Sequence, residues 1–412
     1  MRRGWLRASD LIAFTLIFVA FVPGVLSQTT PATGKSVPPA VEAAGYVFVS
    51  GQGPEGRNGL PDKFADQVRQ TLDNVKNALE TSGLTMDHVV YVQVYLEDVR
   101  QLRELDEVFA NYFLKDPPAR AVLGVAKVPQ KAIQMNAIAV RDLQGKQAVS
   151  VPGTKPNKAF SAGMLTHDQL FISTMQGRDP ATGTIPPDPA SQVNLALDGL
   201  KSVVEAAGLT MAHMVFVNPY MTSEISYGAM NEQYAKRFEF GNTPGRATIE
   251  VSSLPDGAHI AYTGIAVREL SRRLAVRPKN MPPSPTASPC VFAGDLLYCS
   301  AKSGFIPGPN GGVYFASTVD QTRQTMRNLL DNLEEAGMAF DQVVSTTIYL
   351  DDLADTTAFD GVYRRYFPAR LPAQTVVQQA APGDRKTDKE GHYPTLEQVS
   401  LIAVKREGKP SH

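Results

Sequence analysis

One phrase occurs three times in this 412-residue chain, and it constrains the fold more than any other feature. It reads GLTMDHVVYVQVYL from Gly83, GLTMAHMVFVNPYM from Gly208 and GMAFDQVVSTTIYL from Gly337. In each copy a glycine ends an amphipathic helix, a polar turn follows, and an apolar run with β-branched residues predicts a buried strand. The copies begin so far apart that each repeat is long enough to be a domain, unlike the repeats of solenoids. The sequence therefore predicts three copies of one domain.

The residues around the phrase predict the same element order in every repeat. That order is β-β-α-β-α-β-β, an α+β unit with two helices on one face of a sheet and an open second face. Three linked copies can bury the open faces against one another. The sequence therefore predicts an intramolecular pseudo-trimer with domains at residues 35–145, 150–275 and 283–407, of which the third is the most divergent.

The N-terminal segment differs from the repeats. Arg2, Arg3 and Arg7 precede an apolar run without charges at residues 11–26, which is short for a membrane span. Residues 1–27 are interpreted as a signal peptide, with an uncleaved N-terminal anchor as the alternative. Both readings predict an exported protein, periplasmic or secreted, that contacts a membrane only through this segment if it stays uncleaved.

Charge and motif content argue against several classes of partner. The formal net charge of −1 gives no reason to expect a nucleic-acid partner. The six histidines are scattered, so no metal site is expected. The loop GQGPEG, with Gly51, Gly53 and Gly56, matches the dinucleotide fingerprint in form, but no βαβ unit surrounds it. Turn glycines explain the loop better, and no cofactor is expected.

The two cysteines flank a predicted hairpin, CVFAGDLLYC, with Gly294 and Asp295 at its turn. Counting outward from a two-residue turn places Cys290 opposite Cys299, where a disulfide can form in an oxidising compartment. A shift of one residue in register would instead leave two buried free thiols on opposite faces. The sequence leaves both alternatives open.

A short motif recurs just before the first closing strand of each repeat. Proline and a small residue precede a long polar side chain, which is Arg120, Arg246 or Gln374. An arginine at a rigid junction presents a planar fork that suits a carboxylate. A solvated loop arginine or a structural ion pair is the alternative.

Taken together, these segments resemble the RidA/YjgF family of small imine deaminases. The resemblance rests on Val49-Ser50-Gly51-Gln52, the helix that leads into the repeated phrase, the Pro-Ala-Arg junction and the closing strand AIQMNAIAV. It implies a chorismate-mutase-like α+β fold that assembles as a homotrimer, with sites in the clefts between subunits. One chain with three copies of the domain therefore resembles that homotrimer. Family members hydrolyse reactive 2-imino and enamine acids to 2-keto acids and ammonia.

The resemblance also implies roles for individual residues. The carboxylate-binding arginine of the family corresponds to Arg120 and Arg246, whereas Gln374 cannot form a charged fork. Arg370 could replace Gln374 only if its loop turns back. An aromatic residue that the family has near the start of the domain is present only as Phe160.

The family's water-positioning glutamate is expected in the last strand, immediately before the Ala-Ile-Ala-Val ending. This chain has Asn136, Thr263 and Ser400 there. None is a carboxylate base, although each can hold a water molecule by hydrogen bonds. Asn136 and Thr263 are therefore the candidate catalytic residues.

The leading hypothesis is an exported, monomeric pseudo-trimer that binds small carboxylates in its inter-repeat clefts and deaminates 2-imino or enamine acids. A non-catalytic protein that binds small carboxylates or metabolites is the rival, because the glutamate is replaced. Ribonuclease activity has little support in a near-neutral chain without a basic stripe.

Overall fold

A computed structural model of the chain describes residues 35–279, 281–308 and 312–406. The predicted signal peptide, at residues 1–27, lies outside the described residues. Within them, no helix combines the length and the hydropathy that a bilayer crossing requires.

Each repeat forms one mixed β-sheet. The first sheet has the order β1 (Ala40–Ala43), β2 (Tyr46–Gln52), β5 (Ile133–Val140), β3 (Val89–Leu96), β4 (Ala119–Gly124). The second has the order β10 (Gly245–Arg246), β9 (Met214–Met221), β12 (Ile260–Val267), β8 (Gln169–Gln176), β7 (Gly163–Leu165), β6 (Gln147–Val149), and β11 (Ile249–Glu250) also pairs with β9. The third has the order β13 (Arg273–Val276), β14 (Cys290–Ala293), β15 (Leu296–Lys302), β18 (Glu397–Val404), β16 (Val343–Leu350), β17 (Ala373–Gln378). The α+β prediction is confirmed.

The strand of the repeated phrase has an equivalent place in all three sheets. It pairs antiparallel with the last strand and parallel with the strand that follows the second helix. Two sheets gain an extra edge strand from the segment that leaves the preceding repeat, because β6 pairs with β7 and β13 pairs with β14. The predicted boundary after residue 275 therefore falls within β13, which belongs to the third sheet.

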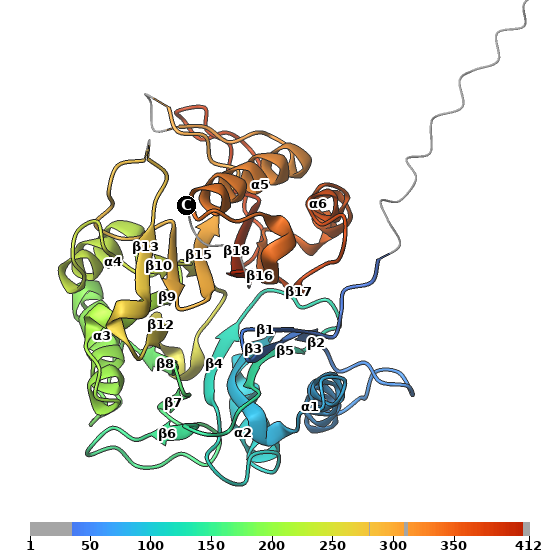
Figure 1. The fold of residues 1–412 in the computed structure, drawn as a ribbon, viewed down its shortest axis with the longest axis vertical. Coiled ribbons are helices and arrows are strands. Elements are labelled where there is room, and N and C mark those ends of the chain that lie inside the picture. The colour runs from blue at the N-terminus through green and yellow to red at the C-terminus, as the bar shows by residue number, and fades with distance from the viewer. Residues whose placement is uncertain (1–34, 280, 309–311, 407–412) are drawn as a thin grey trace, which may run out of the picture.

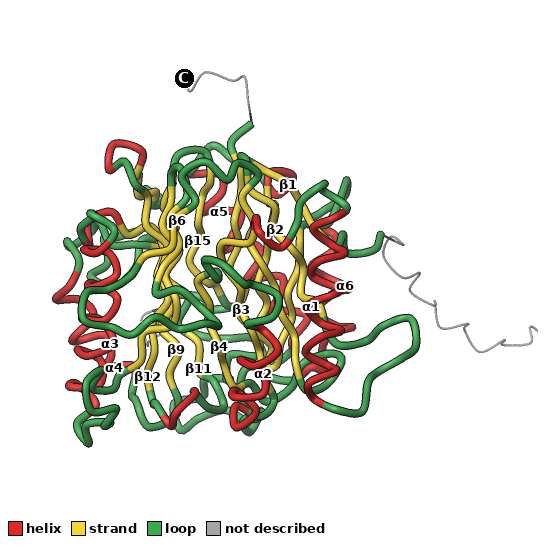
Figure 2. Tube along the Cα trace, turned by 90° about the horizontal axis from the view of Figure 1, so that it is seen from below, coloured by secondary structure: helices red, strands yellow, loops and turns green. Residues whose placement is uncertain are grey.

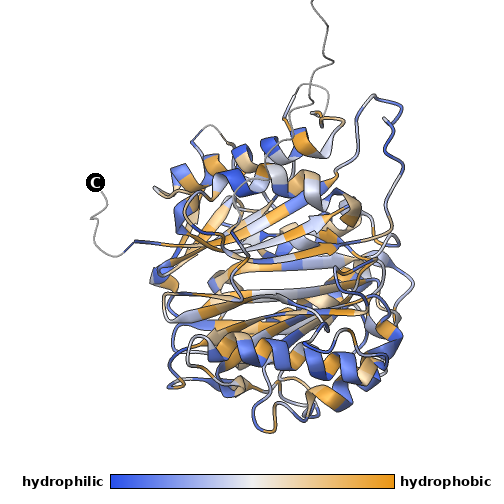
Figure 3. Ribbon diagram, turned by 90° about the vertical axis from the view of Figure 1, so that its right-hand side faces the viewer, coloured by the Kyte–Doolittle hydropathy of each residue, from blue (hydrophilic) through white to orange (hydrophobic). Residues whose placement is uncertain are grey.

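Two helices cover the outer face of each sheet, and they are α1 (Phe64–Glu80), α2 (Leu102–Phe109), α3 (Pro189–Ala206), α4 (Tyr227–Tyr234), α5 (Thr318–Glu335) and α6 (Thr356–Tyr363). Figure 1 shows these pairs on the outside and the sheets turned towards the middle, and Figure 2 shows strands between helices on two sides. The outer helices carry many polar residues, coloured blue in Figure 3. Gly83, Gly208 and Gly337 follow the long helices with φ of 70°, 75° and 69°, which glycine adopts at the lowest cost.

The open faces of the three sheets share one apolar core. Tyr95, Tyr220 and Tyr349 occupy equivalent positions in β3, β9 and β16, and all three belong to this cluster and are buried. The hydroxyl groups of Tyr95 and Tyr349 lie 3.4 Å apart, and Gln93 Nε2 donates to Tyr220 Oη at 2.9 Å. Each repeat also has its own cluster between sheet and helices. The pseudo-trimer prediction is confirmed.

A serine at each repeat boundary bonds two repeats together. The backbone N–H of Arg120 donates to Ser173 Oγ (2.7 Å), that of Arg246 to Ser300 Oγ (2.8 Å) and that of Gln374 to Ser50 Oγ (3.1 Å). Each serine hydroxyl in turn donates to a carbonyl twelve residues earlier, at 2.6 Å. The bonds run from repeat one to two, two to three and three to one, so they close a ring.

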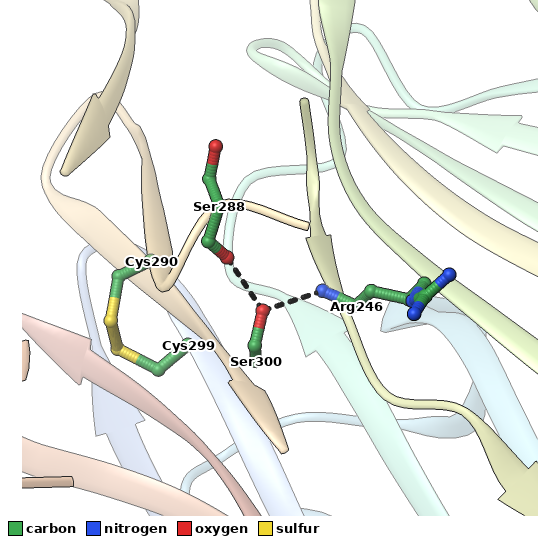
Figure 4. Close-up of a disulfide and its surroundings, with 5 residues drawn as sticks. All are labelled: Arg246, Ser288, Cys290, Cys299 and Ser300. Atoms are coloured by element: carbon green, nitrogen blue, oxygen red, sulfur yellow. Dashed lines mark hydrogen bonds between the residues drawn. A yellow bond between two sulfur atoms is a disulfide. The ribbon is translucent and has the colours of Figure 1, made fainter. Parts of the chain in front are cut away.

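The two cysteines lie in the hairpin of β14 and β15. Cys290 is the cross-strand partner of Cys299, both are fully buried, and a disulfide joins them. Gly294, at the turn, has a φ of 64°. Figure 4 shows the disulfide beside Ser300, which immediately follows Cys299 and bonds to Arg246. The disulfide therefore braces the strand that carries one of the inter-repeat bonds.

One carboxyl group is buried inside the third repeat. Glu397 begins β18, is 1% exposed, and its Oε1 accepts from Thr325 Oγ1 at 2.5 Å. Its Oε2 has no hydrogen-bond partner among the described residues. Burial raises the pKa of Glu397 to about 8, because the charged form loses hydration. The carboxyl is therefore largely protonated at neutral pH.

Glu397 predicts a loss of stability as the pH rises. Its pKa is higher in the folded chain than in the unfolded chain, so its contribution is complete below about pH 4 and declines as the pH rises towards 8. Urea unfolding at pH 5.5 and 8.5 should show this decline in the wild type and a smaller one in Glu397→Gln. An equal decrease in the free energy of unfolding between pH 5.5 and 8.5 in the two proteins would contradict the assignment of this pKa to Glu397.

The serine ring predicts that Ser300→Ala lowers the free energy of unfolding by about 2 kcal/mol, because it leaves a backbone N–H and a carbonyl unpaired. Urea unfolding measures this loss. Ser202→Ala is the control, because the Ser202 hydroxyl bonds only within α3, and it should change stability by about 0.5 kcal/mol or less. Equal effects of the two substitutions would argue against the ring.

Candidate functional site

The three candidate carboxylate-binding positions lie at the three repeat boundaries. Arg120 is in β4, Arg246 in β10 and Gln374 in β17, and the serine bonds hold each strand against the next repeat. The backbone arrangement is thus the same at all three boundaries, whereas the side chains around each position differ. The differences among these environments decide what each cleft can bind.

The Arg120 cleft is closed. The side chain is 3% exposed, and its Nη2 lies 2.5 Å from Asp106 Oδ1. The guanidinium carbon lies 4.8 Å from the centre of the Phe109 ring and 5.2 Å from that of Phe160, which comes from the second repeat. Burial lowers the pKa of Arg120, and the Asp106 carboxylate opposes this effect. Arg120 is therefore held by its ion pair with Asp106 and by the rings of Phe109 and Phe160, while its Nη1 is buried without a hydrogen-bond partner among the described residues.

The Arg246 cleft is open. Arg246 Nη1 donates to Asn231 Oδ1 at 2.7 Å, and the guanidinium carbon lies 5.1 Å from the centre of the Tyr234 ring. Among the described residues, no carboxylate forms an ion pair with Arg246. The side chain borders a cavity of about 290 Å³ between the second and third repeats. The charge of this arginine is thus available to a ligand.

The walls of this cavity offer further polar groups. The second repeat contributes Tyr227 and Thr248, and the third contributes Lys302 and Gln398. Thr248 is 5% exposed, and its Oγ1 has no partner among the described residues. A buried hydroxyl without a partner costs free energy, so a ligand that bonds to it is favoured. Within the part of the chain that the structure describes, no carboxylate side chain lines the cavity.

One helix position explains why one arginine is paired and the other is not. Asp106 and Asn231 each lie three residues before the aromatic ring that stacks on the arginine, and each bonds to that arginine. The carboxylate neutralises Arg120, whereas the amide orients Arg246 without removing its charge. A single carboxylate-to-amide difference thus separates an arginine in an ion pair from an arginine without a carboxylate partner among the described residues.

The third cleft, between the third and first repeats, is neutral. Its cavity of about 370 Å³ is lined by four glutamines, which are Gln52, Gln130, Gln134 and Gln374, and by no charged side chain of the described residues. Arg370 is exposed and does not line it. Asp360, the counterpart of Asp106, pairs instead with Arg364 at 3.0 Å. Gln374 thus lies in a cleft, but one without the charge that a carboxylate needs.

The candidate water-positioning residues lie elsewhere. Asn136 and Ser400 line an internal chamber of about 80 Å³ where the three sheets meet. Asn136 Nδ2 donates to Thr375 Oγ1 at 3.0 Å, and Thr263 Oγ1 accepts from Asn218 Nδ2 at 3.3 Å. Neither Asn136 nor Thr263 lines the Arg246 cavity. Both are mid-strand residues whose side chains bond to neighbouring strands, Asn136 to the third repeat and Thr263 within the second.

The cleft residues that sequence reasoning missed lie two positions earlier in the same strands. Gln398 lines the Arg246 cavity, and Gln134 lines the neutral cleft. Side chains at i and i+2 lie on the same face of a strand. Gln398 and Ser400 therefore point to the same side of β18, but at different distances from the chamber where the three sheets meet. Strand alternation was the available signal, but it cannot say which of two positions reaches the cleft. No sequence pattern identified Lys302 as a residue of this cavity.

The glycine-rich loop packs closely against neighbouring glutamine side chains. A Cβ atom on Gly51 would lie 2.8 Å from Gln134, and one on Gly53 would lie 2.1 Å from Gln130. These glycines therefore permit close packing. Within the described ranges, no cluster of three or more His, Cys, Asp or Glu side chains could hold a metal ion.

The Arg120 pair predicts unequal costs for two equivalent substitutions. Asp106→Ala should lower the free energy of unfolding by about 3 kcal/mol, because it leaves a buried charge unpaired. Asn231→Ala removes one hydrogen bond from a more accessible arginine and should cost about 1 kcal/mol. Urea unfolding of both variants measures the difference, and equal costs would contradict the assigned roles.

Comparisons with known proteins agree with the architecture. The family model described as Endoribonuclease L-PSP matches residues 27–141, 152–268 and 280–385. Protein HMF1 of Saccharomyces cerevisiae is 34% identical over 118 residues, which cover 28% of this chain and 92% of that protein. Reactive Intermediate Deaminase A, chloroplastic, of Arabidopsis thaliana is 38% identical over 94 residues, which cover 23% of this chain and 50% of that protein.

A match across repeats comes from a solved structure. A chorismatase crystal structure matches with a TM-score of 0.50 and 13% identity, covering 77% of this chain and 93% of that one. At this identity the match concerns the fold alone. Together with the three family-model matches, it leads to one conclusion: the chain belongs to the Endoribonuclease L-PSP family, also called the RidA/YjgF family, and has three family domains in tandem.

Proposed function

We propose that the protein deaminates reactive 2-imino and enamine acids to 2-keto acids and ammonia in the cleft between the second and third repeats. The observation that carries this proposal is Arg246, a partly buried guanidinium in an open cavity with no carboxylate partner among the described residues. Membership of a family that includes a reactive intermediate deaminase supports it. Arg120 and Gln374 are assigned no part in the reaction.

Substrate binding follows from the surroundings of Arg246. Asn231 and the Tyr234 ring hold the guanidinium plane, so a carboxylate meets an oriented pair of N–H donors. Charge-assisted bonds of this kind contribute about 1.5–3 kcal/mol each. The Thr248 hydroxyl, which has no partner among the described residues, can bond to the same ligand. The cleft thus anchors one end of a small acid.

The hydrolysis itself needs modest help from the protein. Water adds to the electrophilic imine carbon and one of its protons moves to nitrogen, which gives a carbinolamine. The hydroxyl proton of the carbinolamine then moves to nitrogen as the C–N bond breaks, and the products are the ketone and ammonia. Gln398 can hold the attacking water by a hydrogen bond, but it cannot accept the proton as a carboxylate would. Rate acceleration comes from fixing acid and water together in one cavity, without the factor of about 10²–10⁴ that a general base adds.

The absence of a carboxylate from the cavity lining also favours a second candidate function. A cleft with an anchor and no base fits a non-catalytic protein that binds small carboxylates or metabolites. The same experiment separates the two functions, because the binding protein would recognise a 2-keto acid and leave the rate of imine hydrolysis unchanged.

Export is a further part of the proposal. The apolar N-terminal segment after Arg2, Arg3 and Arg7 motivates it, and the disulfide between Cys290 and Cys299 supports it, since disulfides persist in oxidising compartments. In that setting the protein would meet imino acids outside the cytoplasm.

The deaminase proposal predicts that Arg246→Ala abolishes the acceleration of 2-iminobutanoate hydrolysis. An amino-acid oxidase acting on 2-aminobutanoate generates the imine, and 2-oxobutanoate formation is followed with and without the protein. Arg103→Ala is the control, because it removes an exposed arginine from α2 and should retain full acceleration.

A second variant guards against misfolding of the first. Asn231→Asp places a carboxylate beside Arg246, as Asp106 lies beside Arg120, and should lower the acceleration about ten-fold or more while the protein stays folded. If the wild type gives no acceleration but binds 2-oxobutanoate in an Arg246-dependent manner, the binding function replaces the enzyme. If the wild type and Arg246→Ala accelerate hydrolysis equally and bind 2-oxobutanoate with equal affinity, both functions are rejected for the Arg246 cleft.

A further inference from the structure

A second cation lies in the Arg246 cavity. Lys302 ends β15 and belongs to the opposite wall, which the third repeat supplies. Burial lowers the pKa of Lys302, and no charged group of the described residues offsets this effect. An ammonium that is partly buried and has no ion pair is costly to keep, because it has lost part of its hydration without gaining a counter-charge.

The three repeats differ at the position of Lys302, which lies two residues after an inter-repeat serine. The residue there is Gln52 after Ser50, Met175 after Ser173 and Lys302 after Ser300. Lys302 lines the same cavity as Arg246, the arginine without a carboxylate partner, whereas Gln52 lines the neutral cleft. Met175 packs instead against the apolar cluster between the sheet and the helices of the second repeat. The two unpaired cations occur together.

Charge balance then defines the ligand. One carboxylate would neutralise Arg246 and leave the Lys302 charge uncompensated in a partly buried cavity. A ligand with two negative groups would neutralise both, and each charge-assisted bond contributes about 1.5–3 kcal/mol. Tyr227, Thr248 and Gln398 add neutral hydrogen-bonding groups to the same walls.

We infer that the cavity between the second and third repeats binds small dicarboxylates, with Arg246 holding one carboxylate and Lys302 the other. The planar guanidinium fork suits the carboxylate beside the imine, and the flexible lysine suits the distal one. The volume of about 290 Å³ fits one small molecule. Met281 and Ser284, from the segment that links the two repeats, form part of the wall and help to enclose it.

The inference rests on the proposed function for its chemistry but not for binding. If the cleft deaminates imines, its preferred substrates are 2-imino acids with a second carboxylate, such as the imines formed by oxidation of acidic amino acids. The reaction consumes one water and releases ammonia and a 2-oxo dicarboxylate.

Isothermal titration of the full-length protein with 2-oxoglutarate and 2-oxobutanoate tests the inference. At 0.15 M salt the wild type should bind the dicarboxylate about ten-fold or more tightly than the monocarboxylate. Lys302→Gln, which introduces the residue present in the first repeat, should bind both ligands with similar affinity. Lys201→Gln is the charge-matched control, because it removes an exposed lysine on α3 and should keep the preference.

The outcomes separate this inference from the proposed function. Equal wild-type affinities, or a preference that survives in Lys302→Gln, would overturn the dicarboxylate site even if 2-iminobutanoate is hydrolysed. A Lys302-dependent preference without any hydrolysis would support the site and reject the deaminase. Circular dichroism of Lys302→Gln checks its fold, and retained 2-oxobutanoate binding shows that Arg246 still acts.

Discussion

The hydrogen bond from a strand N–H of one repeat to a serine hydroxyl of the next is the interaction on which this architecture depends. Ser173, Ser300 and Ser50 make it in turn, so the three sheets form a closed ring. Closure buries the face of each sheet that its own helices leave uncovered. The inter-repeat clefts exist only because these edges are held together, and so the same bonds create both the core and the sites.

The main consequence is that three clefts with the same backbone arrangement differ in their charges. In the first cleft Asp106 neutralises Arg120, in the second Asn231 leaves Arg246 charged, and in the third Gln374 carries no charge. A homotrimer of one domain must have three identical sites, whereas a single chain can change each site separately. The fold tolerates these changes because the serine bonds use backbone groups and do not depend on the side chain at the arginine position.

The polar residues of the closing strands illustrate how position along a strand decides a role. Asn136 lies in the shared core, where its amide bonds to Thr375 of another repeat, while Gln134 lies on the same strand and reaches a cleft. Buried amides and hydroxyls at the axis satisfy one another, which fixes how the sheets meet. The Arg246 cavity has Gln398 and Lys302 among its polar groups, and no carboxylate of the described residues lines it.

The sequence by itself determined the repeat number, the α+β class, the element order and the pseudo-trimer, because hydrophobic periodicity, helix-ending glycines and uncovered sheet faces are local or additive properties. It also placed Arg120, Arg246 and Gln374 at equivalent positions. Only the tertiary structure decided that Arg120 is paired, that Arg246 and Lys302 line one cavity and that Asn136 lies where the three sheets meet. These relations join residues far apart in the chain, and their electrostatics depend on burial and on partners that no local pattern contains.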